Sequence, residues 1–148
     1  MVADEDLISP AAGSVQPMEG IIIKSSQNSI DDTYTKLINA INNNENLRLI
    51  RELDHSANAA SVNLELNPTR LVIFGNPNLG TPLMQSAQTI GIDLPQKILV
   101  YENDNGKVNV AYNDPNFLAT RHSITANEDI LTTISNALNN LSEVAITP

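Results

Sequence analysis

Apolar positions along the chain switch between strand-like runs and helical spacing. The β-branched run at 21–23 favours a first strand. After Ser29, apolar side chains recur every three or four residues, at Ile30, Tyr34, Leu37, Ile38 and Ile41. This spacing is typical of one helix face, and Ser29 followed by Asp32 is a helix-start signal. The pattern therefore predicts a helix that ends at the asparagines at 42–44.

The middle of the chain predicts two further strands, at 47–53 and 70–74, and the second is apolar enough for a sheet interior. Small residues at 56–62 predict a short helix between them. The stretch at 75–82 is rich in glycine and proline and predicts a loop. Its last residue, a proline, predicts the start of a short helix over 83–89, because proline fits the first helical turn.

A β-hairpin is predicted around Asn105 and Gly106, which lie between strand patterns at 97–102 and 107–112. Asn-Gly supplies the positive φ angles of a tight turn. On the second arm, apolar side chains share one face and asparagines point from the other: Val108, Val110 and Tyr112 against Asn109 and Asn113. We therefore expect one face of the sheet to be covered.

The last part of the chain predicts a short helix at 116–121 and a long final helix, which Thr125 would cap with Glu128 in the matching position. The elements do not alternate strictly between strand and helix. We therefore predict an α+β fold with two layers, a roughly five-stranded mixed or antiparallel sheet and helices packed on one face. A sheet with an open edge or face often pairs with a second copy, so we expect a homodimer.

Composition and charge exclude several classes. Residues 1–19 hold four acids and no base, without periodicity, which predicts a flexible acidic tail before one domain at 20–148. The net charge of −9 argues against a nucleic-acid partner, because phosphate backbones are bound by Lys and Arg. No run approaches the roughly 20 apolar residues of a membrane span. We expect no membrane partner and a cytoplasmic protein, or an exported one if a signal peptide was removed ahead of Met1.

The polar loop at 74–82 follows a buried strand and is the densest candidate for a site. Loops at strand ends present polar groups and free backbone amides to ligands. The loop lacks the lysine and glycine spacing of phosphate-binding loops, so a nucleotide site is not favoured. The alternative is a rigid turn in which Asn76 caps backbone groups.

Two histidines are the side chains that could titrate near neutrality. His55 follows a strand and is either a hydrogen-bonded structural residue or a ligand contact or general base, whereas His122 is expected on the surface. The chain has no cysteine, so disulfides and thiolate chemistry are excluded, and no metal or cofactor is expected. Asp93 and Asp114 lie near prolines, where they either bond nearby amides or form a carboxylate pair.

Five short motifs occur in order: DHSANAA at 54–60, LNPT at 66–69, VIFGNPNLGTPLM at 72–84, DLP at 93–95 and YNDP at 112–115. Together they resemble the domain of unknown function 302 family, over about residues 20–146. The resemblance implies a compact two-layer α+β domain of bacteria and archaea, often dimeric, and it implies no activity. In another branch of that family cysteines stand at the positions of Gly75 and Gln96, so no thiol or metal role transfers here.

We therefore expect a small-molecule binding or sensing domain. Its candidate pocket residues are His55, Asn58, Phe74, Asn76, Thr81, Asp93 and Tyr112. One alternative is a metal-free hydrolase or isomerase with His55 as the base and Asp93 or Asp114 nearby. Another is a structural or interaction module, which would have a large apolar patch and no concave polar pocket.

Overall fold

Five antiparallel strands form one sheet in the order β1-β5-β4-β3-β2. The computed structural model describes residues 18–148, so most of the tail predicted at 1–19 lies outside the described residues. The strands are β1 (Ile21–Ser25), β2 (Arg48–Asp54), β3 (Thr69–Gly75), β4 (Gln96–Glu102) and β5 (Val108–Asn113). The helices are α2 (Ile30–Asn42), α3 (His55–Ala60), α4 (Pro77–Ser86), the 3-10 helix η1 (Gln88–Ile92), α5 (Pro115–Arg121) and α6 (Glu128–Ile146). The predicted α+β class is confirmed.

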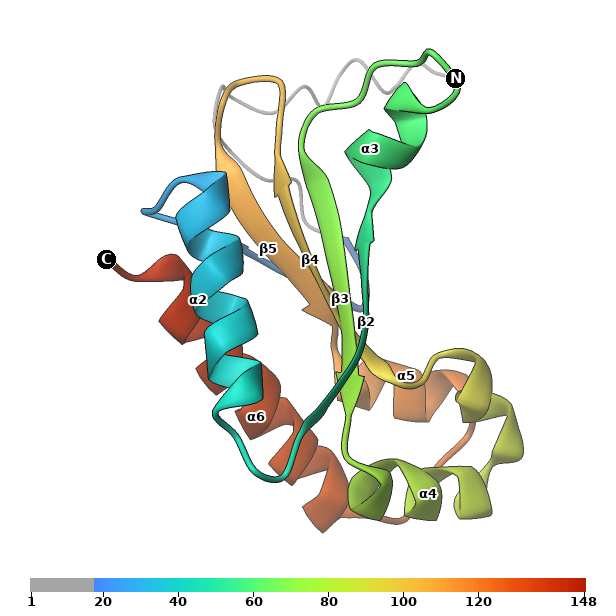
Figure 1. The fold of residues 1–148 in the computed structure, drawn as a ribbon. Helices are drawn as coiled ribbons and strands as arrows, with labels where there is room; N and C mark the ends of the chain where they lie inside the picture. Colours follow the sequence, from blue (N-terminus) through green and yellow to red (C-terminus); the bar gives the residue numbers. More distant parts are fainter. Residues whose placement is uncertain (1–17) are drawn as a thin grey trace.

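The two long helices, α2 and α6, pack side by side against one face of the sheet (Figure 1). Ser29 caps α2 as predicted, because its hydroxyl accepts the Asp32 N–H at 3.1 Å. Between the helices and the sheet lies one apolar core, which includes Leu37, Ile41, Val72, Phe74, Ile98, Val100, Val110 and Leu138. This core fixes the sheet against both helices.

The opposite face of the sheet carries an apolar row that crosses all five strands. Neighbouring residues in the row are paired across the strands, in the order Ile23, Ala111, Leu99, Leu71 and Leu53. All five side chains are half-buried, and α2 and α6 both lie on the other face (Figure 1). We call this row the open-face row.

The predicted hairpin between β4 and β5 is confirmed, but the turn conformation and the exposure of Asn109 differ from the prediction. Gly106 takes a positive φ of 79° but Asn105 does not, and the side-chain oxygen of Asn103 accepts the N–H groups of Asn105 and Lys107 instead. Asn109 points away from the helices as predicted, yet it is only 1% exposed and accepts a hydrogen bond from Ser25 Oγ at 3.2 Å. Asn109 is therefore shielded from solvent although it points away from the helices.

Two predicted helix starts are wrong. The helix expected from Pro82 begins five residues earlier, at Pro77, and contains Pro82 in its interior. Both prolines suit a first turn, but Asn76 supplies the cap that decides between them. The final helix begins after Asn127 rather than at Thr125, with Asn127 at φ 68° and its side-chain amide bonded to Ser86 Oγ. Asparagine tolerates this left-handed conformation.

Candidate ligand-binding pocket

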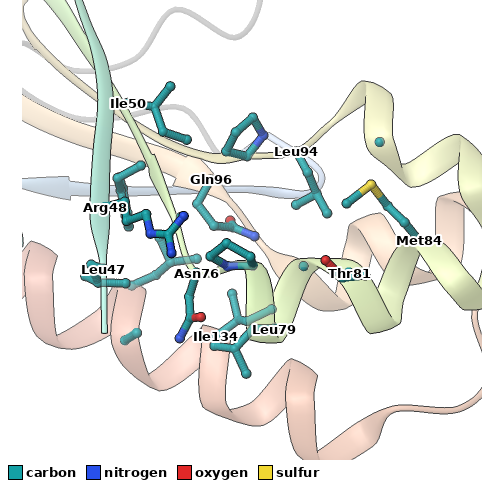
Figure 2. Close-up of a pocket in the computed structure, with 18 residues that line it drawn as sticks. Leu47, Arg48, Ile50, Asn76, Leu79, Thr81, Met84, Leu94, Gln96 and Ile134 are labelled. Carbon is teal, nitrogen blue, oxygen red and sulfur yellow. The ribbon is translucent and has the colours of Figure 1, made fainter. Parts of the chain in front are cut away.

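A concave pocket of about 350 Å³ lies at the end of the sheet where β3 ends and where β2 and β4 begin. Helix α4 and the 3-10 helix η1 form one wall, and α6 contributes Ile134, Ala137 and Leu138 from below (Figure 2). The volume falls at the lower end of the range of small-molecule sites, about 300–1,000 Å³.

Strand register brings the pocket together. Gly75, the last residue of β3, pairs with Arg48 at the start of β2, and Phe74 pairs with Gln96 at the start of β4. The chain leaves β3 into α4 and returns to β4 through the Leu94–Pro95 peptide, which is cis. The start of β2, the end of β3 and the start of β4 therefore lie around one space.

Asn76 both ends β3 and satisfies the start of α4. Its side-chain oxygen accepts the Asn78 N–H at 3.0 Å, while its backbone carbonyl accepts the N–H groups of Leu79 and Gly80 at 2.9 and 3.0 Å. Pro77 has no N–H to offer. The first amides of α4 are therefore engaged within the chain. Asn76 has the capping role that the rigid-turn interpretation gives it, although residues 77–86 form a helix rather than a turn.

The lining is mostly apolar, with few polar side chains. The polar ones are Arg48, Asn76, Thr81 and Gln96. Figure 2 shows the Arg48 side chain reaching from β2 into the space beside Asn76 and Gln96. None of the lining residues is acidic. Thr81 lies apart from the other three, on α4 near Met84 (Figure 2). An apolar space with a few polar groups is suited to a ligand that has an apolar body and one polar end.

Three of the seven predicted pocket residues line this pocket: Phe74, Asn76 and Thr81. His55 and Asn58 lie in α3, at the opposite end of β2 (Figure 1). Tyr112 belongs to the core between the sheet and the helices and is 6% exposed. Asp93 is close in sequence to the lining residue Leu94, but its carboxylate bonds Arg121 and His122 instead. The predicted residues therefore do not form one cluster.

His122 is not the surface residue that the sequence predicts, because its side chain is only 8% exposed. Its Nε2 lies 2.5 Å from Asp93 Oδ2, and its Nδ1 lies 2.9 Å from Thr89 Oγ1. Arg121 binds the other oxygen of Asp93 at 3.1 Å. These contacts join the segment around η1 to the end of α5, which explains why His122 is buried.

The pairing that the hydrolase alternative requires is not found within residues 18–148. His55 forms no ion pair with a carboxylate in this part of the chain, and Asp114 accepts the Asn116 N–H as the cap of α5. Asp114 thus bonds a nearby backbone amide, which is one of the two roles predicted for it from the sequence.

Lys97 stabilises the backbone segment that leads into β4. Its ammonium group donates to the carbonyls of Pro95 and Asp93 at 2.9 and 3.2 Å. Partial burial lowers the pKa of Lys97, and the charge of Asp93 opposes that shift. These hydrogen bonds fix the backbone that leads from η1 into the strand.

Sequence reasoning missed Arg48 and Gln96, which lie at the starts of two strands. Both are separated in sequence from the loop at 74–82, and each is brought to it only by strand pairing. The one available signal was the position of each residue at a predicted strand boundary, where side chains can reach an open end of the sheet.

This geometry defines the class of the protein: a two-layer α+β domain with a pocket at one end of its sheet. The family model described as Domain of unknown function DUF302 matches residues 22–141. The chain belongs to this family.

A solved structure supports the same fold. It is the crystal structure of an uncharacterized conserved protein DUF302 from Bacillus stearothermophilus, with a TM-score of 0.75 and 16% sequence identity. The similarity covers 86% of this chain and 99% of that one. At this level of identity the comparison shows the fold alone.

Curated relatives carry a different kind of name. The chain is 40% identical over 111 residues to "Fluoride-specific ion channel FluC 1" of Brucella suis biovar 1 (strain 1330). This match covers 75% of this chain and 43% of that protein. A protein of the same name from Brucella abortus biovar 1 (strain 9-941) matches at 40% identity over 41% of its length. The chain thus spans less than half of either relative. Within residues 18–148, every helix is too short or too polar to cross a bilayer.

Proposed function

We propose that this chain is a small-molecule binding or sensing domain and that its ligand site is the pocket between α4, α6 and the strand ends. The observation that carries this proposal is the pocket itself, a concave space of about 350 Å³ with an apolar lining and a few polar groups. Exposing apolar side chains to water is unfavourable, and a ligand that covers them regains that free energy.

Gly80 provides a direct test, because it lines the pocket and lies in α4 without a positive φ. A Cβ at position 80 would lie 3.7 Å from Leu94 Cδ1, and both residues line the pocket, so the side chain of Gly80→Leu should occupy the space. A metabolite screen by thermal shift is run on the native protein first. A ligand present at 100 times its Kd raises the free energy of unfolding by about 2.7 kcal/mol. For a chain of this size that corresponds to a rise of roughly 5–10 °C in Tm.

We expect every ligand found this way to lose its effect on Gly80→Leu. The matched control is Ala60→Leu, which adds the same side chain to an exposed position in α3, at the far end of the sheet. The control should bind as the native protein does. If Gly80→Leu keeps the full shift, the ligand site lies elsewhere and the proposal is wrong.

We also propose that the chain forms a homodimer through the open-face row. A sheet face with five apolar side chains is stabilised when a second layer covers it. Sedimentation velocity should report a dimer for the native protein and a monomer for Leu99→Glu, since that carboxylate would lie at the centre of the row. Val144→Glu, at an exposed position of α6, is the control and should remain dimeric. A native monomer would overturn this proposal without affecting the pocket.

A further inference from the structure

The charge of the pocket is opposite to that of the protein. The chain carries a net charge of −9, yet Arg48 is the one ionisable side chain among the residues that line the pocket. A cationic ligand would meet only the guanidinium there, which would repel it. A ligand with one negative charge would be attracted at short range, where the screening effect of salt is smallest.

The guanidinium of Arg48 has no carboxylate partner within residues 18–148. Two other arginines already have partners. Arg121 forms an ion pair with Asp93, and the Arg70 guanidinium lies 3.8 Å from the centre of the Tyr34 ring. A guanidinium presents two parallel N–H groups that match the two oxygens of a carboxylate. Arg48 is therefore available for a bidentate contact with a ligand.

Neighbouring side-chain amides can add donors beside the guanidinium. The side-chain oxygen of Asn76 is occupied by the Asn78 N–H, which leaves its NH₂ group for the pocket. The side chain of Gln96 forms no hydrogen bond within the described residues, and it lies beside Arg48 and Asn76 in Figure 2. One guanidinium and two amide groups can together satisfy a single planar anion.

A phosphate group is a poorer match for the same site. Phosphate sites at helix starts depend on free backbone amides, and Asn76 already engages the N–H groups of Asn78, Leu79 and Gly80. A single arginine also leaves a dianion incompletely neutralised. The apolar lining beyond Arg48 requires an apolar body on the ligand.

We infer that the pocket takes a small organic monocarboxylate with an apolar body, whose carboxylate is bound by Arg48. This inference rests on the proposed function, because it assigns a ligand class to the same pocket. Arg48 is a binding residue in it, while Asn76 and Gln96 orient the carboxylate.

The test compares acids with their neutral amides, which have nearly the same shape. Isothermal titration calorimetry is run with 3-phenylpropanoate and octanoate against 3-phenylpropanamide and octanamide. Because Arg48 is exposed, its contact with a carboxylate should make each acid bind up to about fivefold more tightly than its amide. Arg48→Gln should remove this preference, because it weakens binding of each acid more than binding of its amide. Arg51→Gln, on the same strand but outside the pocket, is the matched control and should keep the preference.

The outcomes of this test separate the two proposals. If the amides bind the native protein as tightly as the acids, or if Arg48→Gln keeps the preference, the carboxylate assignment is overturned and the pocket function stands. If the acids bind Gly80→Leu as well as they bind the native protein, the pocket is not their site and both proposals fail. If no acid binds the native protein at millimolar concentration, the carboxylate assignment fails, and the metabolite screen on the native protein and Gly80→Leu decides the pocket function separately.

Discussion

The same substitution, glycine to alanine, should have opposite effects on stability at two positions of this chain. Gly80 lies in α4 without a positive φ, and a Cβ there would lie 3.7 Å from Leu94 Cδ1, an ordinary van der Waals distance. Gly106 lies in the hairpin turn at φ 79°, where an added Cβ would meet nothing within 4 Å. Space permits both changes, so the backbone conformation decides the sign.

For Gly80→Ala we expect the free energy of unfolding to rise by about 0.5–1 kcal/mol. Alanine loses less conformational entropy than glycine when it enters a helix. The contact with Leu94 adds only about 0.1–0.2 kcal/mol per atom pair. For Gly106→Ala we expect a fall of about 1–2 kcal/mol, the cost of holding an L-residue in the left-handed region.

Urea unfolding followed by far-UV circular dichroism measures both effects, with the midpoint moving at constant m-value. If Gly80→Ala is destabilised, the contact with Leu94 is tighter than the structure indicates and the reasoning fails. An unchanged midpoint for Gly106→Ala would likewise contradict the left-handed turn. Gly80→Ala also narrows the pocket, so a gain in stability together with weaker ligand binding would mean that the glycine is kept for the ligand.

Three further predictions follow from side-chain contacts. Asn76→Ala should lower the free energy of unfolding by about 0.5–2 kcal/mol in urea titrations, because α4 loses its cap. Hydrogen bonds from Ala57 and Ser56 lower the pKa of Asp54, so its stabilising effect should be complete above about pH 4 and be lost as the pH falls through the folded-state value. Urea titrations of Asp54→Asn between pH 2 and 6 should lack this component. Burial and the hydrogen bond to Glu52 raise the pKa of Tyr34, so its contribution to stability should be lost as the pH rises above about 10. Tyr34→Phe should lower the free energy of unfolding by about 1 kcal/mol at pH 7, and its free energy of unfolding should fall less at alkaline pH.

Local signals predicted the elements whose structure is determined locally. The hairpin, the capped start of α2 and the strands could be predicted because turn residues, caps and alternation act over a few neighbouring positions. The start of α4 could not, since Pro77 and Pro82 satisfy the same rule and the choice depends on where β3 ends. Asn127 shows the same limit, because its side chain bonds Ser86 in another helix.

The candidate site was predictable only where it lies within one segment. Phe74, Asn76 and Thr81 follow one another along the chain, so the loop identified them together. His55 also follows a strand, but β2 and β3 are antiparallel, and Asp54 pairs with Arg70 at the far end. The residues after two antiparallel neighbours lie at opposite ends of the sheet. Arg48 reaches the pocket for the same reason, and strand direction cannot be read from a local pattern.

The connection between β3 and β4 has a consequence for how this family can diverge. Adjacent antiparallel strands can be joined by a turn of two residues, and β4 and β5 are joined by a short turn in this chain. Residues 76–95 replace such a turn with α4 and η1, and they supply much of the pocket wall. Substitutions or insertions in this connection can alter the proposed ligand site while the strand ladder and the core stay intact. The fold persists at 16% identity in the Bacillus stearothermophilus protein. The proposed pocket can therefore change from one family member to another without a change of fold.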